Sequence, residues 1–215
     1  MVASANANTV TFDTPGGATT SGGPVDANAT FMTGAGTLTI KLVNLEANPT
    51  DVAQLISDLT FTLSSGQTSG NLTSSSGLER TVAGNGSFAD GSLPVDTGWA
   101  LTGLHLDVLG TPIGPAHLII GPPDASNKYS NANGSIAGNN AHNPFLTGAE
   151  FTISIPTLTS QDNVTSATFS FGTTAGQNLV PGVPQIINTI PDGGTTVLLL
   201  GAGLSGLGLV RRKLS

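Results

Sequence analysis

Apolar and polar residues alternate with a period of two in several short stretches of this chain. In the clearest of them Leu, Ile, Phe or Ala takes every second position, and Thr, Ser or Lys lies between; these are residues 37–42, 59–63, 151–155 and 167–171. Successive side chains of a β-strand point to opposite faces, so each stretch predicts a strand with one apolar and one hydroxyl-rich face. Two sheets of such strands bury their apolar faces against each other, which is the packing of a β-sandwich.

Weaker patterns extend this prediction over most of the chain. Further strands are expected at residues 9–13, 29–33, 99–109 and 116–120, with turns rich in Gly, Asn, Asp and Pro between them. One or two helical turns are expected at 51–57, with Thr50 as the capping residue. We therefore predict an all-β fold of at least about seven strands, an antiparallel β-sandwich of jelly-roll or immunoglobulin-like type, in residues 9–180. The patterns do not specify the strand order.

Two segments lack this alternation and predict irregular structure. Residues 121–143 are rich in Asn and Gly, and we expect them to form an exposed loop. Further along the chain Pro181, Pro184 and Pro191 occur at wide spacing, which indicates a semi-extended spacer. We assign the spacer, with the motif at its end, to residues 181–194.

The end of the chain combines a hydrophobic run with a basic terminus. Residues 195–210 contain no charged side chain, and Arg211, Arg212 and Lys213 follow directly. As a helix the run would be about 24 Å long, against roughly 30 Å for the hydrocarbon core of a bilayer. Because cations after such a span stay on the cytoplasmic side, we predict a C-terminal hydrophobic helix that serves as a transmembrane segment, with 211–215 as its basic cytoplasmic tail. The alternative is a buried C-terminal helix of the globular domain.

A short Pro-Asp motif precedes the hydrophobic run. It consists of Ile190, Pro191, Asp192, Gly193 and Gly194. Together with the run and the cations, the motif resembles the PEP-CTERM class of exosortase sorting signals, most closely the variant whose signature is Val-Pro-Asp-Ser-Gly. The chain departs from that signature by Ile at the first position and Gly at the fourth. The resemblance covers the last 26 residues and concerns sorting, not the remainder of the chain.

The resemblance implies a defined route out of the cell. The steps are export across the inner membrane, transient anchoring there by the C-terminus, recognition by an integral membrane exosortase, removal of the tail, and delivery to the cell surface or extracellular matrix. Export is also indicated at residues 1–8, where two overlapping Ala-x-Ala triplets between Ala3 and Ala7 fit a signal peptidase site. No charged or apolar region precedes them, so this segment is either the remnant of a signal peptide and its cleavage region or a chance pattern in an Ala-rich stretch.

The low content of charged residues and the negative net charge limit which molecules the chain can bind. Charged residues make up 9% of the chain, against roughly 25% in ordinary soluble domains. The formal net charge is −7, and outside the basic tail only Lys41, Arg80 and Lys128 are positive. Because such a body repels phosphates, we exclude nucleic acid as a partner. The absence of Cys excludes disulfides, thiolate metal sites and a cysteine nucleophile.

Candidate chemistry is sparse, and we assign no catalytic residues. His105 and Asp107 share one face of a predicted strand and could begin a metal site; a solvent-facing polar pair is the alternative. No third ligand is identifiable, because His117 and His142 lie in other segments. A catalytic serine is unsupported, since the chain has no Gly-x-Ser-x-Gly motif. Glycoside hydrolysis would need carboxylates that converge in the fold. The glutamates are Glu46, Glu79 and Glu150.

Two kinds of ligand are considered for the body of the chain. Trp99 is the candidate contact for a carbohydrate, with a core position as its alternative. A structural calcium ion is the second, because several Gly-rich loops contain oxygen ligands, although the sequence does not place the site. These ligands are Asp26, Asn28, Asp90, Asp96, Asp124 and Asn127. No other cofactor is expected.

Two functions of different classes agree with these features. In the first, the chain is an exported cell-surface or extracellular-matrix protein without catalytic activity, in a biofilm for example, with extracellular polysaccharide as a partner. In the second, an exported carbohydrate-binding module or hydrolase uses the same tail, because a targeting signal does not specify its cargo. If the fold brings two or three of the His and Glu side chains and Asp107 into one pocket, the enzyme is favoured; if they are dispersed, it is not.

Overall fold

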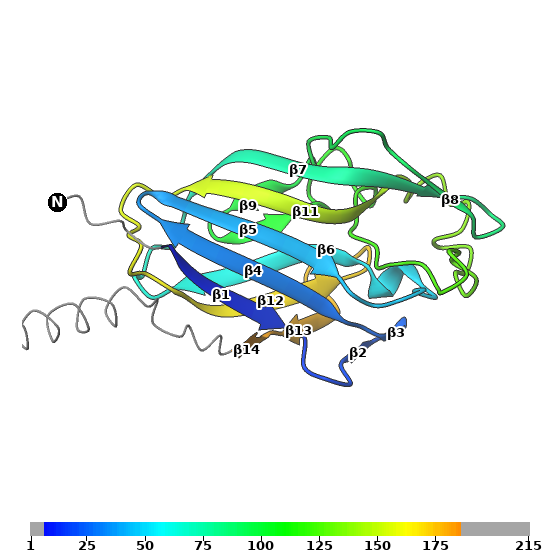
Figure 1. The fold of residues 1–215 in the computed structure, drawn as a ribbon, viewed down its shortest axis with the longest axis horizontal. Helices are drawn as coiled ribbons and strands as arrows, with labels where there is room; N and C mark the ends of the chain where they lie inside the picture. The colour runs from blue at the N-terminus through cyan, green and yellow to red at the C-terminus, as the bar shows by residue number, and fades with distance from the viewer. Residues whose placement is uncertain (1–6, 186–215) are drawn as a thin grey trace, which may run out of the picture. The chain divides into compact units, whose positions relative to one another are not determined.

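The computed structural model describes residues 7–185, and its main strands pair antiparallel in two sheets (Figure 1). The larger sheet has seven strands in the spatial order β14 (Val183–Gln185), β1 (Asn8–Asp13), β4 (Ala27–Gly34), β5 (Thr37–Asn44), β11 (Phe145–Ser154), β7 (Asn71–Val82) and β8 (Phe88–Asp90). The smaller has five, in the order β13 (Leu179–Pro181), β12 (Val164–Phe171), β6 (Ile56–Leu63), β10 (His105–Asp107) and β9 (Ala100–Thr102). Strands β2 (Thr19–Thr20) and β3 (Gly23–Pro24) form a separate hairpin. The predicted all-β fold is confirmed.

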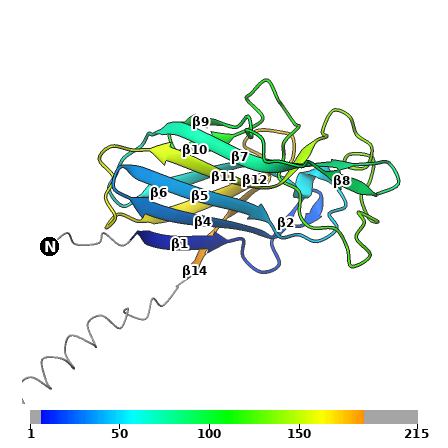
Figure 2. The ribbon, with the colours of Figure 1, turned by 45° about the horizontal axis from the view of Figure 1, so that its top comes forward.

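The two sheets lie one over the other and enclose the hydrophobic core. Figures 1 and 2 show β4 and β5 of the larger sheet in front of β6 of the smaller one. Each inner face is formed by the apolar residues of the alternating patterns, which are buried throughout β5 and β6. Aromatic rings connect the layers. Phe31 of β4 lies 5.4 Å from Phe61 of β6, and Trp99 lies 5.4 Å from Phe151 of β11, measured between ring centroids.

The alternating patterns located most of the long strands. The strands predicted at 9–13, 29–33, 37–42, 59–63, 151–155 and 167–171 are β1, β4, β5, β6, β11 and β12. The longest strand, β7, was not predicted, because its first half reads Asn-Leu-Thr-Ser-Ser-Ser and has no alternating apolar face. β7 obtains its structure from pairing with β11 instead.

Three local predictions require correction. The stretch 99–109 is a hairpin of β9 and β10 rather than one strand, because Gly103 adopts a φ of 64° and turns the chain. The stretch 116–120 forms isolated bridges only; Ile119 pairs with one residue of each sheet. The helical segment is a single 3-10 turn, Val52–Gln54, and its cap is Asp51 rather than Thr50.

The C-terminal end of the sandwich extends beyond the predicted boundary at residue 180. β13 pairs with β12 in the smaller sheet, and β14 pairs with β1 in the larger. Gly182 lies between them, where the chain crosses from one sheet to the other, and its N–H donates to the carbonyl of Ala167 at 2.8 Å. The compact unit ends at Gln185, so residues 181–185 belong to the domain and not to the spacer.

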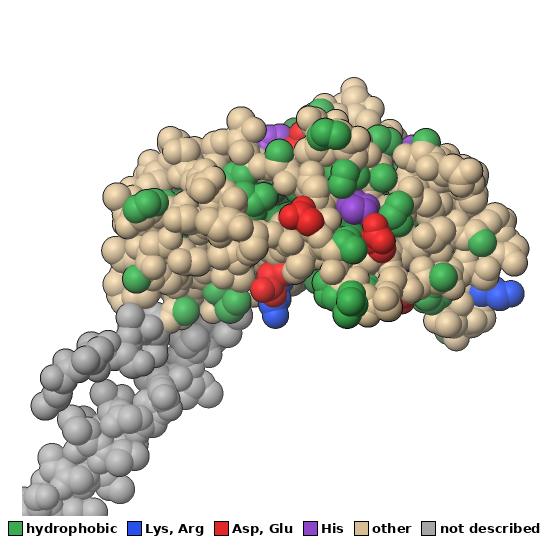
Figure 3. Space-filling model, turned by 90° about the horizontal axis from the view of Figure 1, so that it is seen from above, with side chains coloured by type: hydrophobic (Ala, Val, Ile, Leu, Met, Phe, Trp, Pro, Cys, Tyr) green, Lys and Arg blue, Asp and Glu red, His purple; other side chains and the backbone are tan. Residues whose placement is uncertain are grey.

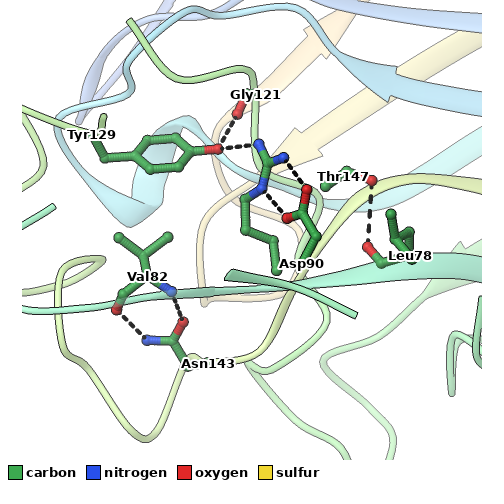
Figure 4. A network of polar contacts seen from close by, with 8 residues as sticks. Leu78, Val82, Asp90, Gly121, Tyr129, Asn143 and Thr147 are labelled. Carbon is green, nitrogen blue, oxygen red and sulfur yellow. Dashed lines mark hydrogen bonds and ion pairs between the residues drawn. The ribbon is translucent and has the colours of Figure 1, made fainter. Parts of the chain in front are cut away.

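The segment 121–143 contains no strand, as expected. It is not simply an exposed loop, however, because buried and hydrogen-bonded side chains attach it to the sandwich. The hydroxyl of buried Tyr129 donates to the Gly121 carbonyl at 2.7 Å and accepts from Arg80 Nη1 at 2.9 Å. Arg80 also donates to both carboxylate oxygens of Asp90, at 2.6 and 2.7 Å. Figure 4 shows this network, which attaches the long segment to β7 and β8.

Several predictions lie outside the described residues. They are the sorting motif at 190–194, the hydrophobic helix at 195–210, the basic tail at 211–215 and most of the N-terminal segment 1–8. Within residues 7–185, no helix has the length and apolar character needed to cross a membrane.

Candidate functional site

His105 and Asp107 lie on β10 and share the outer face of the smaller sheet, while Leu106 between them is buried, as the alternation predicted. The pairing of β10 with β6 places Asp107 directly opposite Asp58. His105 Nε2 lies 3.4 Å from Asp58 Oδ1. Sequence analysis missed Asp58, because only the strand register brings it beside two residues so distant in the chain.

Asp58 is the buried member of this cluster, with 2% of its side chain exposed. Burial raises the pKa of Asp58; Ser170 and His105 counteract part of that shift, and the charge of Asp107 adds to it. Asp58 Oδ2 has no hydrogen-bond partner among the described residues. Within 7–185 no three His, Asp or Glu side chains are placed to hold a metal ion. His105, Asp107 and Asp58 form a polar cluster on the paired strands β10 and β6.

His117 is the centre of a second polar cluster, in which both nitrogens of its ring contact an oxygen atom. Nδ1 lies 2.8 Å from the Thr97 carbonyl oxygen and Nε2 lies 2.9 Å from Glu79 Oε1. The backbone at His117 has a φ of 63°, and its carbonyl accepts a hydrogen bond from Trp99 Nε1 at 3.1 Å. The ring could therefore serve as a base or metal ligand only by breaking one of these contacts.

The remaining candidates for acid–base chemistry lie elsewhere. Glu150 forms an exposed ion pair with Lys41 at 3.7 Å, and the ring of His142 contacts a backbone carbonyl of the long segment. Among the side chains whose convergence would favour an enzyme, His117 contacts Glu79, and His105 shares a face of β10 with Asp107. In the described part of the chain no three of them are placed to hold a metal ion.

Trp99 occupies the core position that was the alternative to a carbohydrate contact. It is 4% exposed, packs against Phe151, and its ring N–H is used by the His117 carbonyl. A ring buried on both faces offers no platform for a sugar. Among the other aromatic residues, Phe88 is only partly buried, and the guanidinium of Arg80 covers its ring at 4.0 Å.

The loop carboxylates considered as calcium ligands are engaged in local contacts. Asp90 pairs with Arg80, and Asp96 accepts a hydrogen bond from the backbone N–H two residues further on. Hydroxyl groups of two nearby serines donate to Asp124 and lower its pKa to about 2. Asp90, Asp96 and Asp124 thus each stabilise a turn or a strand pair within their own part of the chain.

The described chain ends in a strand that is paired with the domain. Thr11 of β1 is the partner of Gln185 in β14. Only residues 186–189 separate Gln185 from the first residue of the predicted sorting motif.

Comparison with known proteins decides the nature of the terminal segment. A family model described as VPDSG-CTERM motif matches residues 190–214. The chain carries a VPDSG-CTERM sorting tail. The tail supports an exported protein that is sorted and processed by an exosortase-type enzyme. No curated protein and no solved structure matches the chain, so the comparisons concern the VPDSG-CTERM tail and not the sandwich.

Proposed function

We propose that this chain is a non-enzymatic component of the cell surface or extracellular matrix, released from its membrane anchor by an exosortase. The observation that carries the proposal is the VPDSG-CTERM motif at residues 190–214. In this route the β-sandwich is the cargo, and the hydrophobic run with its basic end holds it transiently in the inner membrane. Extracellular polysaccharide is the proposed partner after release.

The surface of the sandwich supports a structural role in such a matrix. Hydroxyl side chains on neighbouring strands bond to one another, as Thr11 does with Thr30 at 3.0 Å and Thr62 with Ser166 at 2.6 Å. On the face shown in Figure 3, the few charged side chains are scattered rather than gathered in one patch. Salt screens interactions between charged groups. Because this surface is solvated mainly by hydroxyl and amide groups, its interactions should change little with ionic strength.

The C-terminus of the mature protein tests the processing step. Protein recovered from the native host, from cell-surface and matrix fractions separately, would be analysed by intact-mass and C-terminal peptide mass spectrometry. We expect a terminus within residues 190–194 and enrichment in the surface or matrix fraction. Secreted protein that retains Ser215 would contradict the proposal.

Substitutions in the motif identify the signal itself. We expect Pro191→Ala and Asp192→Ala to leave the tail attached and the protein in the membrane fraction, because the Pro-Asp segment is the proposed recognition element. Asn188→Ala, just outside the motif, is the matched control and should be processed normally. Normal processing of both motif variants would show that another feature is recognised.

An exported hydrolase or carbohydrate-binding module gains no support from the arrangement of the described residues. Its proposed carbohydrate contact, Trp99, is buried, and both ring nitrogens of His117 are engaged. Turnover of a polysaccharide by the purified chain would reverse this choice and would leave the sorting proposal unaffected.

A further inference from the structure

The tripeptide Asn-Gly-Ser occurs twice in the chain, at residues 85–87 and 133–135. In both copies the asparagine is exposed, and its Oδ1 accepts hydrogen bonds from the backbone N–H and the hydroxyl of the serine. These bonds measure 3.0 and 2.7 Å in the first copy and 2.7 and 2.6 Å in the second. The two copies therefore share their local chemistry and differ mainly in the surroundings of the glycine.

An asparagine that precedes glycine can modify itself. The glycine nitrogen loses its proton and forms a bond to the asparagine Cγ, the Cγ–Nδ2 bond breaks, and Nδ2 leaves as ammonia. Water then opens the cyclic imide at either carbonyl, which yields aspartate or isoaspartate. Glycine has no Cβ to hinder the attack, and hydrogen bonds to Oδ1 stabilise the negative charge that develops there. The availability of the glycine nitrogen therefore sets the rate.

In the first copy the glycine is held in a turn between β7 and β8. Gly86 is buried, and its N–H donates to the Ala83 carbonyl at 2.9 Å. Its own carbonyl accepts from the N–H of Tyr129 at 2.9 Å. A Cβ at Gly86 would lie 2.6 Å from the Tyr129 carbonyl oxygen, so the backbone there is closely packed. The nitrogen of Gly86 can attack only after this turn opens.

In the second copy the glycine nitrogen is available. Gly134 is exposed, and its N–H has no hydrogen-bond partner within residues 7–185. No heavy atom lies within 4 Å of the position that a Cβ would take. We propose that Asn133 is a site of intramolecular deamidation in the folded chain, whereas the turn at Gly86 protects Asn85.

Asn133 also attaches the long segment 121–143 to the 3-10 turn. Its Nδ2 donates to Asp51 Oδ2 at 2.7 Å, and its backbone N–H donates to the Thr50 carbonyl at 2.8 Å. Burial opposes ionisation of Asp51, but hydrogen bonds from the Ala53 N–H and the Asn133 side chain lower its pKa overall. Deamidation removes the Nδ2 donor and places a second carboxylate beside that of Asp51. The modification therefore weakens this attachment.

The rates at the two copies test the proposal in the full-length chain. The protein would be incubated at mildly alkaline pH, folded and in urea, and peptide mass spectrometry would follow aspartate and isoaspartate at both positions. In the folded chain we expect Asn133 to react at least about fivefold faster than Asn85, because only Gly86 must first give up a hydrogen bond. In urea the two rates should be similar. Equal rates in the folded chain, or a difference that persists in urea, would overturn the proposal.

A glycine variant tests the attacking group. Gly134→Ala fits without a clash and places a methyl group beside the nitrogen, so deamidation of Asn133 should slow at least about fivefold while Asn85 is unaffected. Gly16→Ala is the matched control, because a Cβ there also has no heavy atom within 4 Å, and both rates should stay as in the parent chain. An unchanged rate at Asn133 in Gly134→Ala would show that the backbone nitrogen is not the nucleophile.

The product can be made directly as Asn133→Asp. We expect hydrogen exchange of the residue 133 backbone amide, which donates to Thr50, to become about fivefold faster at neutral pH. Asn131→Asp is the control, an exposed position whose side chain has no hydrogen bond among the described residues, and it should leave that exchange unchanged. Unchanged exchange in Asn133→Asp would reject the weakened attachment.

Discussion

At the scale of single residues, buried polar side chains connect segments that the alternating pattern treats as independent. The amide of Asn44 donates to the carbonyl groups of Gln54 and Ile119, at 2.8 and 3.0 Å. His117 connects two further segments through Thr97 and Glu79. Such contacts could not be predicted from the sequence. A buried polar side chain needs a hydrogen-bond partner, but the sequence does not indicate which distant group that partner will be.

Asp58→Asn should stabilise the fold at neutral pH. Because burial raises the pKa of Asp58 in the folded chain, the ionised carboxylate opposes folding above that pKa, and the penalty vanishes as pH falls toward the unfolded value of about 3.9. Asn keeps the shape and can still accept from His105. We expect the melting temperature at pH 7 to rise by about 2–4 °C, the equivalent of about 1 kcal/mol, and the gain to shrink at pH 4. Thermal unfolding of both proteins at both pH values measures this, and a loss of stability at pH 7 would contradict it.

His117→Ala should destabilise the fold strongly for a single histidine. The substitution removes both ring contacts and leaves the buried Thr97 carbonyl without its partner. We expect the free energy of unfolding to fall by about 2–4 kcal/mol in urea denaturation. His142→Ala is the control, because that ring is half-buried and its one hydrogen-bonding contact among the described residues is with the Ser135 carbonyl; it should cost about 1 kcal/mol or less. Similar small losses from both variants would show that the His117 contacts contribute little.

At the scale of elements, the alternating pattern predicted those strands whose apolar residues face the core along their whole length. It missed strands that lack such a face and are held by hydrogen bonds to a neighbouring strand. β5 and β6 show the first case and β7 the second, since β7 is polar along its exposed first half. The 99–109 error has a different cause, because apolar residues continue on both sides of the turn at Gly103. β13 and β14 were missed because their prolines suggested a spacer, although short edge strands tolerate proline.

Gly182→Val should weaken the attachment of the last two strands. A Cβ at Gly182 would lie 3.1 Å from both Phe12 Cβ and Phe169 Cε2, and 3.2 Å from the Ala167 carbonyl oxygen. Because backbone and core atoms cannot all move away, we expect a loss of about 1–3 kcal/mol in the free energy of unfolding. Gly84→Val is the matched control, since no heavy atom lies within 4 Å of a Cβ there. Equal effects in the two variants would mean that the crossing point is not tightly packed.

At the scale of the whole molecule, the sorting of the chain could be predicted from its sequence, whereas a ligand of the β-sandwich could not. The tail combines a motif, an apolar run and cations in an order that the matching family model also recognises. The cluster around Asp58 depends on strand register, which no local pattern encodes. Sorting information is local in sequence, whereas binding sites are assembled from distant segments.

Two truncations test whether the sandwich is complete without its tail. A chain ending at Gln185 retains every described strand, so its melting temperature should lie within about 1 °C of the full-length value, while association with lipid vesicles should be lost. A chain ending at Asn178 lacks β13 and β14 and exposes apolar surface beside Phe12 and Phe169. It should melt at least about 6 °C lower, the equivalent of about 2 kcal/mol. If the shorter chain were as stable as the longer, the last strands would be dispensable. If truncation at Gln185 left vesicle binding intact, the hydrophobic run would not be the membrane anchor.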